Sequence, residues 1–111
     1  MSEPAIFAQI RQTVADHPVV LFMKGTADRP QCGFSQMVVR VLDHMGVEFE
    51  DVNVLADPDI REGIKAYTDW PTIPQLYVKG EFVGGCDIIR EMFETGELKT
   101  LFEEKGVLEA A

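Results

Sequence analysis

The chain has 111 residues and a net charge of −9; 46% of its residues are hydrophobic and 26% are charged. This length and hydrophobic content suit one folded domain over residues 1–111, and the scattered charges argue against disorder. An acidic chain lacks the basic footprint that nucleic acids or an anionic membrane surface would require, so neither is an expected partner.

The sequence shows no recognisable targeting segment. No apolar run is long enough to span a membrane, and the N-terminal MSEPAIFAQIRQ has the layout of neither a secretory signal nor a transit peptide. We therefore expect a cytoplasmic protein, with a processed organellar protein as the alternative. In a reducing compartment its two cysteines, Cys32 and Cys86, are expected to be functional thiols or metal ligands rather than a structural disulfide.

Hydrophobic periodicity and turn residues predict the order α-β-α-β-α-β-β-α-α. The first expected elements are a helix over 3–16 with Ser2 as cap, a strand at 19–23 buried on both faces, and a helix over 33–45 with one apolar stripe (Phe34, Met37, Val38, Val41, Leu42, Met45). A strand within 47–54 and a helix opened by Asp57 and Pro58 follow. The last elements are a hairpin over 72–85 that turns at Lys79-Gly80, a helix from Asp87, and a final helix after Gly96. The tail 106–111 is expected to fray. A βαβ unit followed by a hairpin and a helix predicts an α/β protein, a four-stranded mixed sheet flanked by helices, which is the thioredoxin-like arrangement.

Cys32 lies in RPQCGFSQ, directly before the helix over 33–45. Backbone N–H groups and the helix dipole favour an anion there, so the pKa of the thiol should be lowered, and the thiolate is both a nucleophile and a metal ligand. The alternative is a buried, inert cysteine, which the surrounding loop and cap residues disfavour. Ser35 stands where a Cys-x-x-Cys motif has its second thiol, so no disulfide can form across the motif. Its hydroxyl is expected to help an N-terminal amide of the helix.

The segment WPTIPQLY contains two prolines, and Ile73-Pro74 precedes a predicted strand. An Ile-Pro bond before the hairpin of this fold is a candidate cis peptide. A cis bond would leave the N–H and C=O of Ile73 facing the thiol, where they could pair with an extended peptide as one more strand would. The alternative is an ordinary loop proline.

Two further groups suggest a binding site. Lys24 ends the first predicted strand, and Arg61 and Lys65 lie on one helix face, so the three could form an anion site or simply be solvated charges. In GGCD, exposed amides could bind a carboxylate while Asp87, the expected helix cap, binds an ammonium; a plain capped helix is the simpler interpretation. Together these groups describe a short peptide with a thiol and two carboxylates, and glutathione fits that description.

The motifs MKGT, CGFS, WPTIPQLY and GGCD, in this order and spacing, resemble the CGFS-type monothiol glutaredoxins over roughly residues 3–106, and the short chain looks like their single-domain bacterial form. The resemblance implies a thioredoxin fold, glutathione binding, and a [2Fe–2S] cluster shared by two subunits. Each subunit would give its Cys32 thiolate and each glutathione its own, which makes the usual four ligands. The implied glutathione contacts are Lys24 and Arg61 on the glycine carboxylate, Ile73 on the cysteinyl backbone, and Cys86 and Asp87 on the γ-glutamyl head.

The resemblance also implies a homodimer bridged by the cluster, mixed complexes with BolA-type proteins, and transfer of clusters to apo iron–sulfur proteins. We therefore expect an iron–sulfur carrier. The alternative is an oxidoreductase that removes glutathione from mixed disulfides, with Cys32 as nucleophile and a second glutathione resolving the product. Gly33-Phe34 and the long loop before Cys32 favour the carrier. A Cys32–Cys86 disulfide is a third state to consider; it requires α-carbons within about 7 Å.

Overall fold

The computed structural model describes residues 3–109. Its elements are α1 (Ala5–Asp16), β1 (Val19–Met23), α2 (Gly33–His44), β2 (Glu50–Asn53), the 3-10 helix η1 (Val54–Ala56), α3 (Pro58–Tyr67), β3 (Gln75–Val78), β4 (Glu81–Gly84), α4 (Cys86–Thr95) and α5 (Glu97–Glu104). The strands form one sheet in the order β2-β1-β3-β4. β1 pairs parallel with β2 and antiparallel with β3, and β3 pairs antiparallel with β4. The predicted four-stranded mixed sheet is confirmed.

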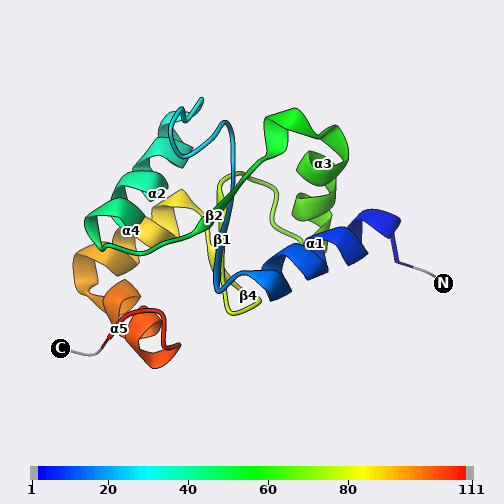
Figure 1. The fold of residues 1–111 in the computed structure, drawn as a ribbon. Helices are drawn as coiled ribbons and strands as arrows, with labels where there is room; N and C mark the ends of the chain where they lie inside the picture. Colours follow the sequence, from blue (N-terminus) through cyan, green and yellow to red (C-terminus); the bar gives the residue numbers. More distant parts are fainter. Residues whose placement is uncertain (1–2, 110–111) are drawn as a thin grey trace.

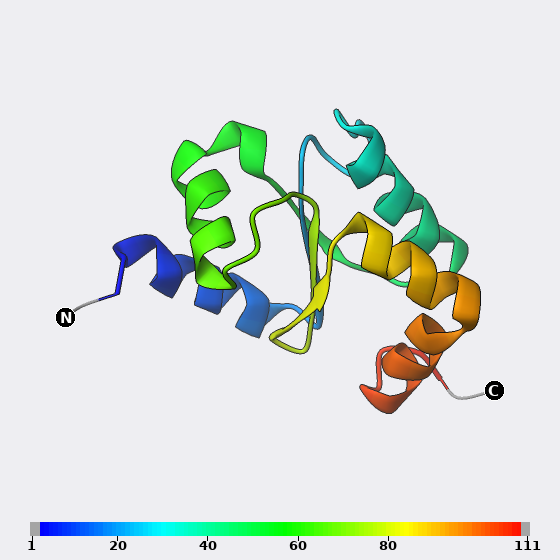
Figure 2. The same cartoon turned by 180° about the vertical axis from the view of Figure 1, so that it is seen from behind.

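The sheet lies between two helical layers, with α1 and α3 on one side and α2, α4 and α5 on the other (Figures 1 and 2). β1 is at the centre, and all five of its residues are buried, as its unbroken apolar sequence predicted. Successive side chains of a strand point to opposite faces. Val19, Leu21 and Met23 therefore join the core beneath α2, α4 and α5, while Val20 and Phe22 join the core beneath α1 and α3.

Local turn and cap residues work as predicted at two places. The Asp57 carboxylate accepts hydrogen bonds from the N–H groups of Asp59 and Ile60 at 3.0 and 3.3 Å, so it caps α3. Between β3 and β4, Lys79 and Gly80 have φ values of 52° and 81°. Two consecutive positive φ values are what a tight two-residue hairpin requires.

The early boundaries differ slightly from the predictions. α1 begins at Ala5 with Pro4 as its N-cap, and the predicted cap, Ser2, lies outside the described residues. The strand expected within 47–54 spans only Glu50–Asn53. It ends there because the Asn53 side chain accepts a hydrogen bond from the Leu55 N–H at 3.0 Å and caps η1.

The prediction that the C-terminal tail frays was wrong for residues 106–108. The N–H groups of Val107 and Leu108 both donate to the Phe102 carbonyl, at 2.8 and 3.2 Å. Both side chains also pack against the core beneath α2, α4 and α5, and burying their apolar surface holds the chain on the protein. Across the described residues, no helix is long and apolar enough to cross a membrane.

Candidate functional site

Cys32 is the N-cap residue of α2, at the end of the sheet where β1 stops and both α2 and α3 begin (Figure 1). Its backbone is extended, with φ −152° and ψ 133°. Its carbonyl accepts the first hydrogen bond of the helix, from Gln36 N–H at 2.9 Å. The thiol is partly exposed. The predicted placement of Cys32 at a helix start is confirmed.

The loop between β1 and α2 is fixed by side chains from the end of β2. Gly25 N–H donates to the Asn53 side-chain oxygen at 2.9 Å, and Ala27 N–H donates to the Asp51 carboxylate at 2.7 Å. Buried or partly buried backbone groups need such partners. The loop that delivers Cys32 is therefore ordered by the neighbouring strand.

Ser35 occupies the position of a second motif thiol and is fully buried. Its hydroxyl accepts a hydrogen bond from Lys24 N–H at 3.1 Å. We expected an amide of α2 as the partner, but the partner is the residue that follows β1. The Ser35 hydroxyl therefore ties the first turn of α2 to the end of the central strand.

The pKa of the Cys32 thiol is lowered from its ordinary value of 9.0. Burial acts in the opposite direction and is the largest single effect. It is outweighed together by hydrogen bonds from the N–H groups of Ser35 and Phe34, by the Lys24 ammonium, and by the Ser35 hydroxyl. The thiolate at position 32 is thus stabilised mainly by the amino end of α2.

Cys86 has the opposite character. Burial raises the pKa of its thiol above 9.0, and the charge of Asp87 raises it further; the charge of Arg90 lowers it, and a Cys32 thiolate has the smallest effect, which raises it. The effect of Cys32 on the pKa of Cys86 indicates that the two thiols belong to the same neighbourhood. Both thiols are free. The disulfide considered above is absent from this state of the protein.

Alkylation with iodoacetamide should distinguish the two thiols. The thiolate is the reactive form, and Cys32 deprotonates at a lower pH than Cys86 because their pKa values lie below and above 9.0 respectively. As pH rises, Cys32 should therefore be modified first. Peptide mass spectrometry at each pH would follow both sites. The single-cysteine variants Cys32→Ser and Cys86→Ser would assign each modified peptide to its thiol. Earlier labelling of Cys86 would contradict this order.

A groove of about 200 Å³ lies beside the thiol end of α2. Its walls include Phe34 from α2, Trp70, Ile73 and Pro74 from the loop before β3, and Cys86 and Asp87 from α4. The Ile73–Pro74 peptide is cis, as predicted. The structure thus brings three of the predicted binding residues, Ile73, Cys86 and Asp87, to one groove.

Asp87 does not cap α4, so that prediction was wrong. The helix begins one residue earlier, at Cys86, with Gly85 as N-cap and no capping side chain. Gly85 fits tightly: a Cβ there would stand 3.2 Å from both the Pro74 carbonyl oxygen and the Trp70 indole nitrogen. The Asp87 side chain is 86% exposed and lies 3.7 Å from Arg90. Its carboxylate is therefore accessible to a ligand.

The predicted basic residues, Lys24, Arg61 and Lys65, do not gather at the groove as Ile73, Cys86 and Asp87 do. Lys24 acts on the Cys32 thiolate through its charge. Arg61 lies on α3, and its Nε atom is buried with no hydrogen-bond partner among the described residues. Lys65 is engaged with Glu62 at 3.2 Å. None of these three basic residues lines the groove of about 200 Å³, and Cys32 is not among its lining residues either.

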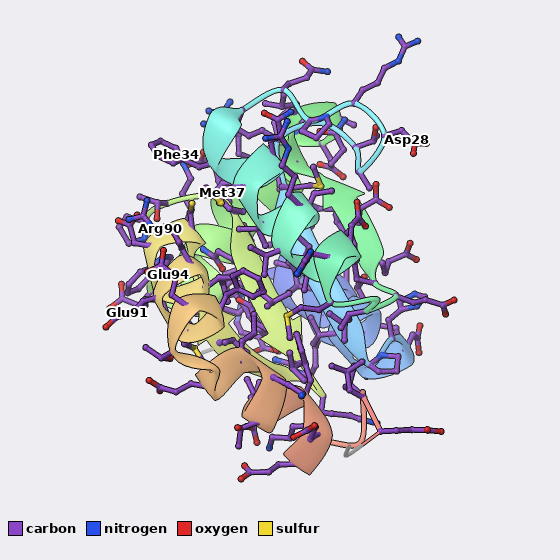
Figure 3. All side chains as sticks on the ribbon, turned by 90° about the vertical axis from the view of Figure 1, so that its left-hand side faces the viewer. Asp28, Phe34, Met37, Arg90, Glu91 and Glu94 are labelled. Carbon is purple, nitrogen blue, oxygen red and sulfur yellow. The ribbon has the colours of Figure 1, made fainter. Side chains whose placement is uncertain are left out.

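Sequence reasoning missed that apolar side chains in the first turns of α2 are exposed, and that one of them, Phe34, lines the groove. Phe34 and Met37 belong to the apolar stripe of α2, yet they are 62% and 37% exposed. Figure 3 shows them at the thiol end of α2, on the side where Arg90 and Glu94 of α4 lie. The available signal was their position in the first turns of a helix that opens with a reactive thiol.

The described residues contain no cluster of three His, Cys, Asp or Glu side chains able to hold a metal ion. A thiolate-bound iron–sulfur cluster needs four ligands. One described chain thus supplies too few groups for such a cluster without outside ligands.

Comparison with known proteins identifies the family. A family model for glutaredoxins matches residues 19–83. A probable monothiol glutaredoxin of Rickettsia typhi is 51% identical over 99 residues, which are 89% of each chain. The chain belongs to the monothiol glutaredoxin family. A rice relative named monothiol glutaredoxin-S11 is 53% identical over 106 residues, 96% of this chain but only 22% of the rice protein.

Solved glutaredoxins share the fold. The solution structure of reduced poplar apo GrxS14 has a TM-score of 0.81 and 51% identity, covering 92% of this chain and 94% of the poplar chain. A buckwheat glutaredoxin–glutathione complex has a TM-score of 0.80 and 25% identity, covering 92% of this chain and 91% of that one. The thioredoxin-like glutaredoxin fold predicted from the sequence is confirmed.

Proposed function

We propose that this glutaredoxin is of the CGFS type and carries a [2Fe–2S] cluster as cargo, held between two copies of the chain and two glutathione molecules. The observation that carries the proposal is the lone motif thiol. Cys32 is a partly exposed thiol with a lowered pKa, two residues before the groove-lining Phe34, and the buried Ser35 stands where a second thiol would be. Such a thiolate suits metal ligation.

The donor set fits a shared cluster. The described residues hold no metal site of their own, and each copy would contribute the Cys32 thiolate. Two copies and two glutathione thiolates give four sulfur ligands, the usual number for [2Fe–2S]. Because two of the four ligands would belong to glutathione, only the two Cys32 bonds to the protein would have to break for the cluster to leave.

The groove suits glutathione. We assign its cysteinyl backbone to the main chain of Ile73 and its γ-glutamyl head to Cys86 and Asp87, where α4 begins and amides point outward. The exposed Asp87 carboxylate would accept the ammonium. Lys24 and Arg61, which do not line this groove, would hold the glycine carboxylate outside it. The buckwheat relative, solved as a complex with glutathione, supports this ligand.

We further propose that BolA-type proteins and apo iron–sulfur proteins are partners of the loaded form. The second candidate function is the glutathione-dependent oxidoreductase. The low pKa of Cys32 favours attack on a mixed disulfide just as it favours ligation. The two functions use the same thiol. An assay of cluster binding or of mixed-disulfide reduction is therefore needed to tell them apart, because the site residues are the same.

Anaerobic reconstitution with iron, sulfide and glutathione tests the proposal. We expect a coloured protein with the visible absorbance of a [2Fe–2S] cluster and a dimeric mass in solution. Omitting glutathione should leave a colourless monomer, because two of the four ligands are then missing. A colourless monomer in the presence of glutathione that instead reduces a glutathione mixed disulfide would reject the carrier and favour the oxidoreductase.

A further inference from the structure

Gln75 is a buried amide in which every hydrogen-bonding group is satisfied. The residue is fully buried. Its Nε2 group donates to the carbonyl oxygens of Trp70 at 3.0 Å and Thr72 at 3.2 Å. Its Oε1 atom accepts hydrogen bonds from the hydroxyls of Thr68 at 3.1 Å and Tyr77 at 3.0 Å. Both donors and both acceptor positions of the side chain are therefore in use.

The two carbonyls belong to the loop that forms a wall of the groove. Trp70, Thr72 and Ile73 all line it. The start of the loop is tied to α3, because Trp70 N–H donates to the Lys65 carbonyl at 2.9 Å. Gln75 supplies the corresponding restraint from the sheet, at Trp70 and Thr72, which lie three residues and one residue before Ile73.

The sheet side of this contact is rigid. Gln75 is the first residue of β3 and lies opposite Phe22 of the central strand. Tyr77 is also buried, and its ring packs edge-on against Phe22 with centroids 5.5 Å apart. Burial raises the pKa of Tyr77 to about 12, so its hydroxyl stays protonated and remains a donor. The oxygen of the Gln75 amide is thus fixed by Thr68 and Tyr77, while its N–H groups donate to the loop.

We propose that Gln75 is a positioning residue for glutathione: by binding the Trp70 and Thr72 carbonyls, it sets the conformation in which Ile73 presents its main chain to the ligand. This inference rests on the proposed glutathione site. A primary amide is required, because it alone among side chains of this size combines two donors with an acceptor. Without the donors, two partly buried carbonyls would have to find partners in water, and the loop would turn with them.

Two substitutions isolate the contact. Gln75→Met keeps the length of the side chain and removes all its hydrogen bonds. Gln75→Glu keeps acceptor oxygens for Thr68 and Tyr77 but removes at least one of the two donors to the loop, and both when the carboxyl is ionised. Leu98→Ala is the matched control, since Leu98 is equally buried but lies in α5, in the core on the opposite side of the sheet. It lowers stability without touching the loop.

The measurement is a titration of iron-free protein with reduced glutathione, followed by ¹H–¹⁵N NMR. Trp70 is the one tryptophan of the sequence, so its indole N–H gives a single resonance that reports on the groove wall. We expect Gln75→Met and Gln75→Glu to bind glutathione about tenfold more weakly, the scale of one or two hydrogen bonds. Their indole resonance should be displaced even without ligand, while Leu98→Ala keeps both the resonance and the affinity of the wild type.

The outcomes separate this inference from the proposed function. If the wild type does not bind glutathione, the proposed function fails and the role of Gln75 falls with it. If the wild type binds and the folded Gln75 variants bind equally well, the role of Gln75 alone is refuted. An equal loss of affinity in Leu98→Ala would also refute it, because general destabilisation would then explain the effect.

Discussion

The Cys32→Ser variant is expected to bind no cluster after anaerobic reconstitution with glutathione, so its visible absorbance should fall to that of a protein-free control. A serine hydroxyl does not provide the thiolate that the proposed [2Fe–2S] site requires from each copy. The fold should persist, because residue 32 is partly exposed at an N-cap, and serine is a good cap. Visible spectra and solution mass, recorded beside urea unfolding curves, would measure both effects.

Cys86→Ser is the informative companion to this variant. It removes the other thiol but keeps the main chain that we assign to the γ-glutamyl head, so it should still bind the cluster. In Cys32→Ser the free energy of unfolding should change by less than about 1 kcal/mol, which is usual for substitutions of partly exposed residues. A coloured, dimeric Cys32→Ser protein would show that the cluster ligand lies elsewhere.

The parts of the fold that the sequence predicted are those decided by short-range patterns. β1 is an unbroken apolar run, and such a run is buried wherever helices cover both faces of a sheet. The Lys79-Gly80 turn and the Asp57-Pro58 helix start each depend on two adjacent residues. These signals need no knowledge of the rest of the chain.

Asp87 shows where such reasoning stops. Asp57 caps its helix because Pro58 follows it and fixes the first helical position. Asp87 has the same side chain but no such neighbour, and packing moves the helix start to Cys86. Gly85 is held between the Pro74 carbonyl and the Trp70 ring, which are distant in sequence. Tertiary contacts therefore decided a boundary that composition could not.

The sequence predicted several residues of the candidate site, but it did not predict the buried residue that holds the loop of the groove in place. Cys32, Ile73 and Asp87 are conspicuous because a thiol before a helix, an Ile-Pro bond and an acidic residue after Gly84-Gly85 each suggest a role from the neighbouring residues alone. Gln75 has none: in the sequence it is one polar residue at the start of a strand. Its four hydrogen bonds reach residues two to seven positions away, and they form only once the loop has folded back on β3. The exposure of Phe34 likewise depends on where α4 packs.

Gly25→Ala is expected to destabilise the protein by about 2–4 kcal/mol and to lower the yield of reconstituted cluster. Gly25 has φ +89°, a conformation that side chains with a Cβ rarely adopt. An added Cβ would stand 2.5 Å from the Arg29 carbonyl oxygen and 2.7 Å from the Gln31 nitrogen, both backbone atoms. The loop would have to open, and this is the loop that delivers Cys32 to the start of α2.

Gly33→Ala is the matched control for that effect. Gly33 lies just beyond the same loop, as the first residue of α2, with a negative φ and no atom within 4 Å of an added Cβ. Its replacement should change the free energy of unfolding by no more than about 0.5–1 kcal/mol, in the stabilising direction, because alanine restricts the unfolded chain. Urea unfolding of both variants would compare them. Equal destabilisation by the two substitutions would mean that loss of glycine flexibility near Cys32, rather than the backbone contacts of Gly25, controls stability there.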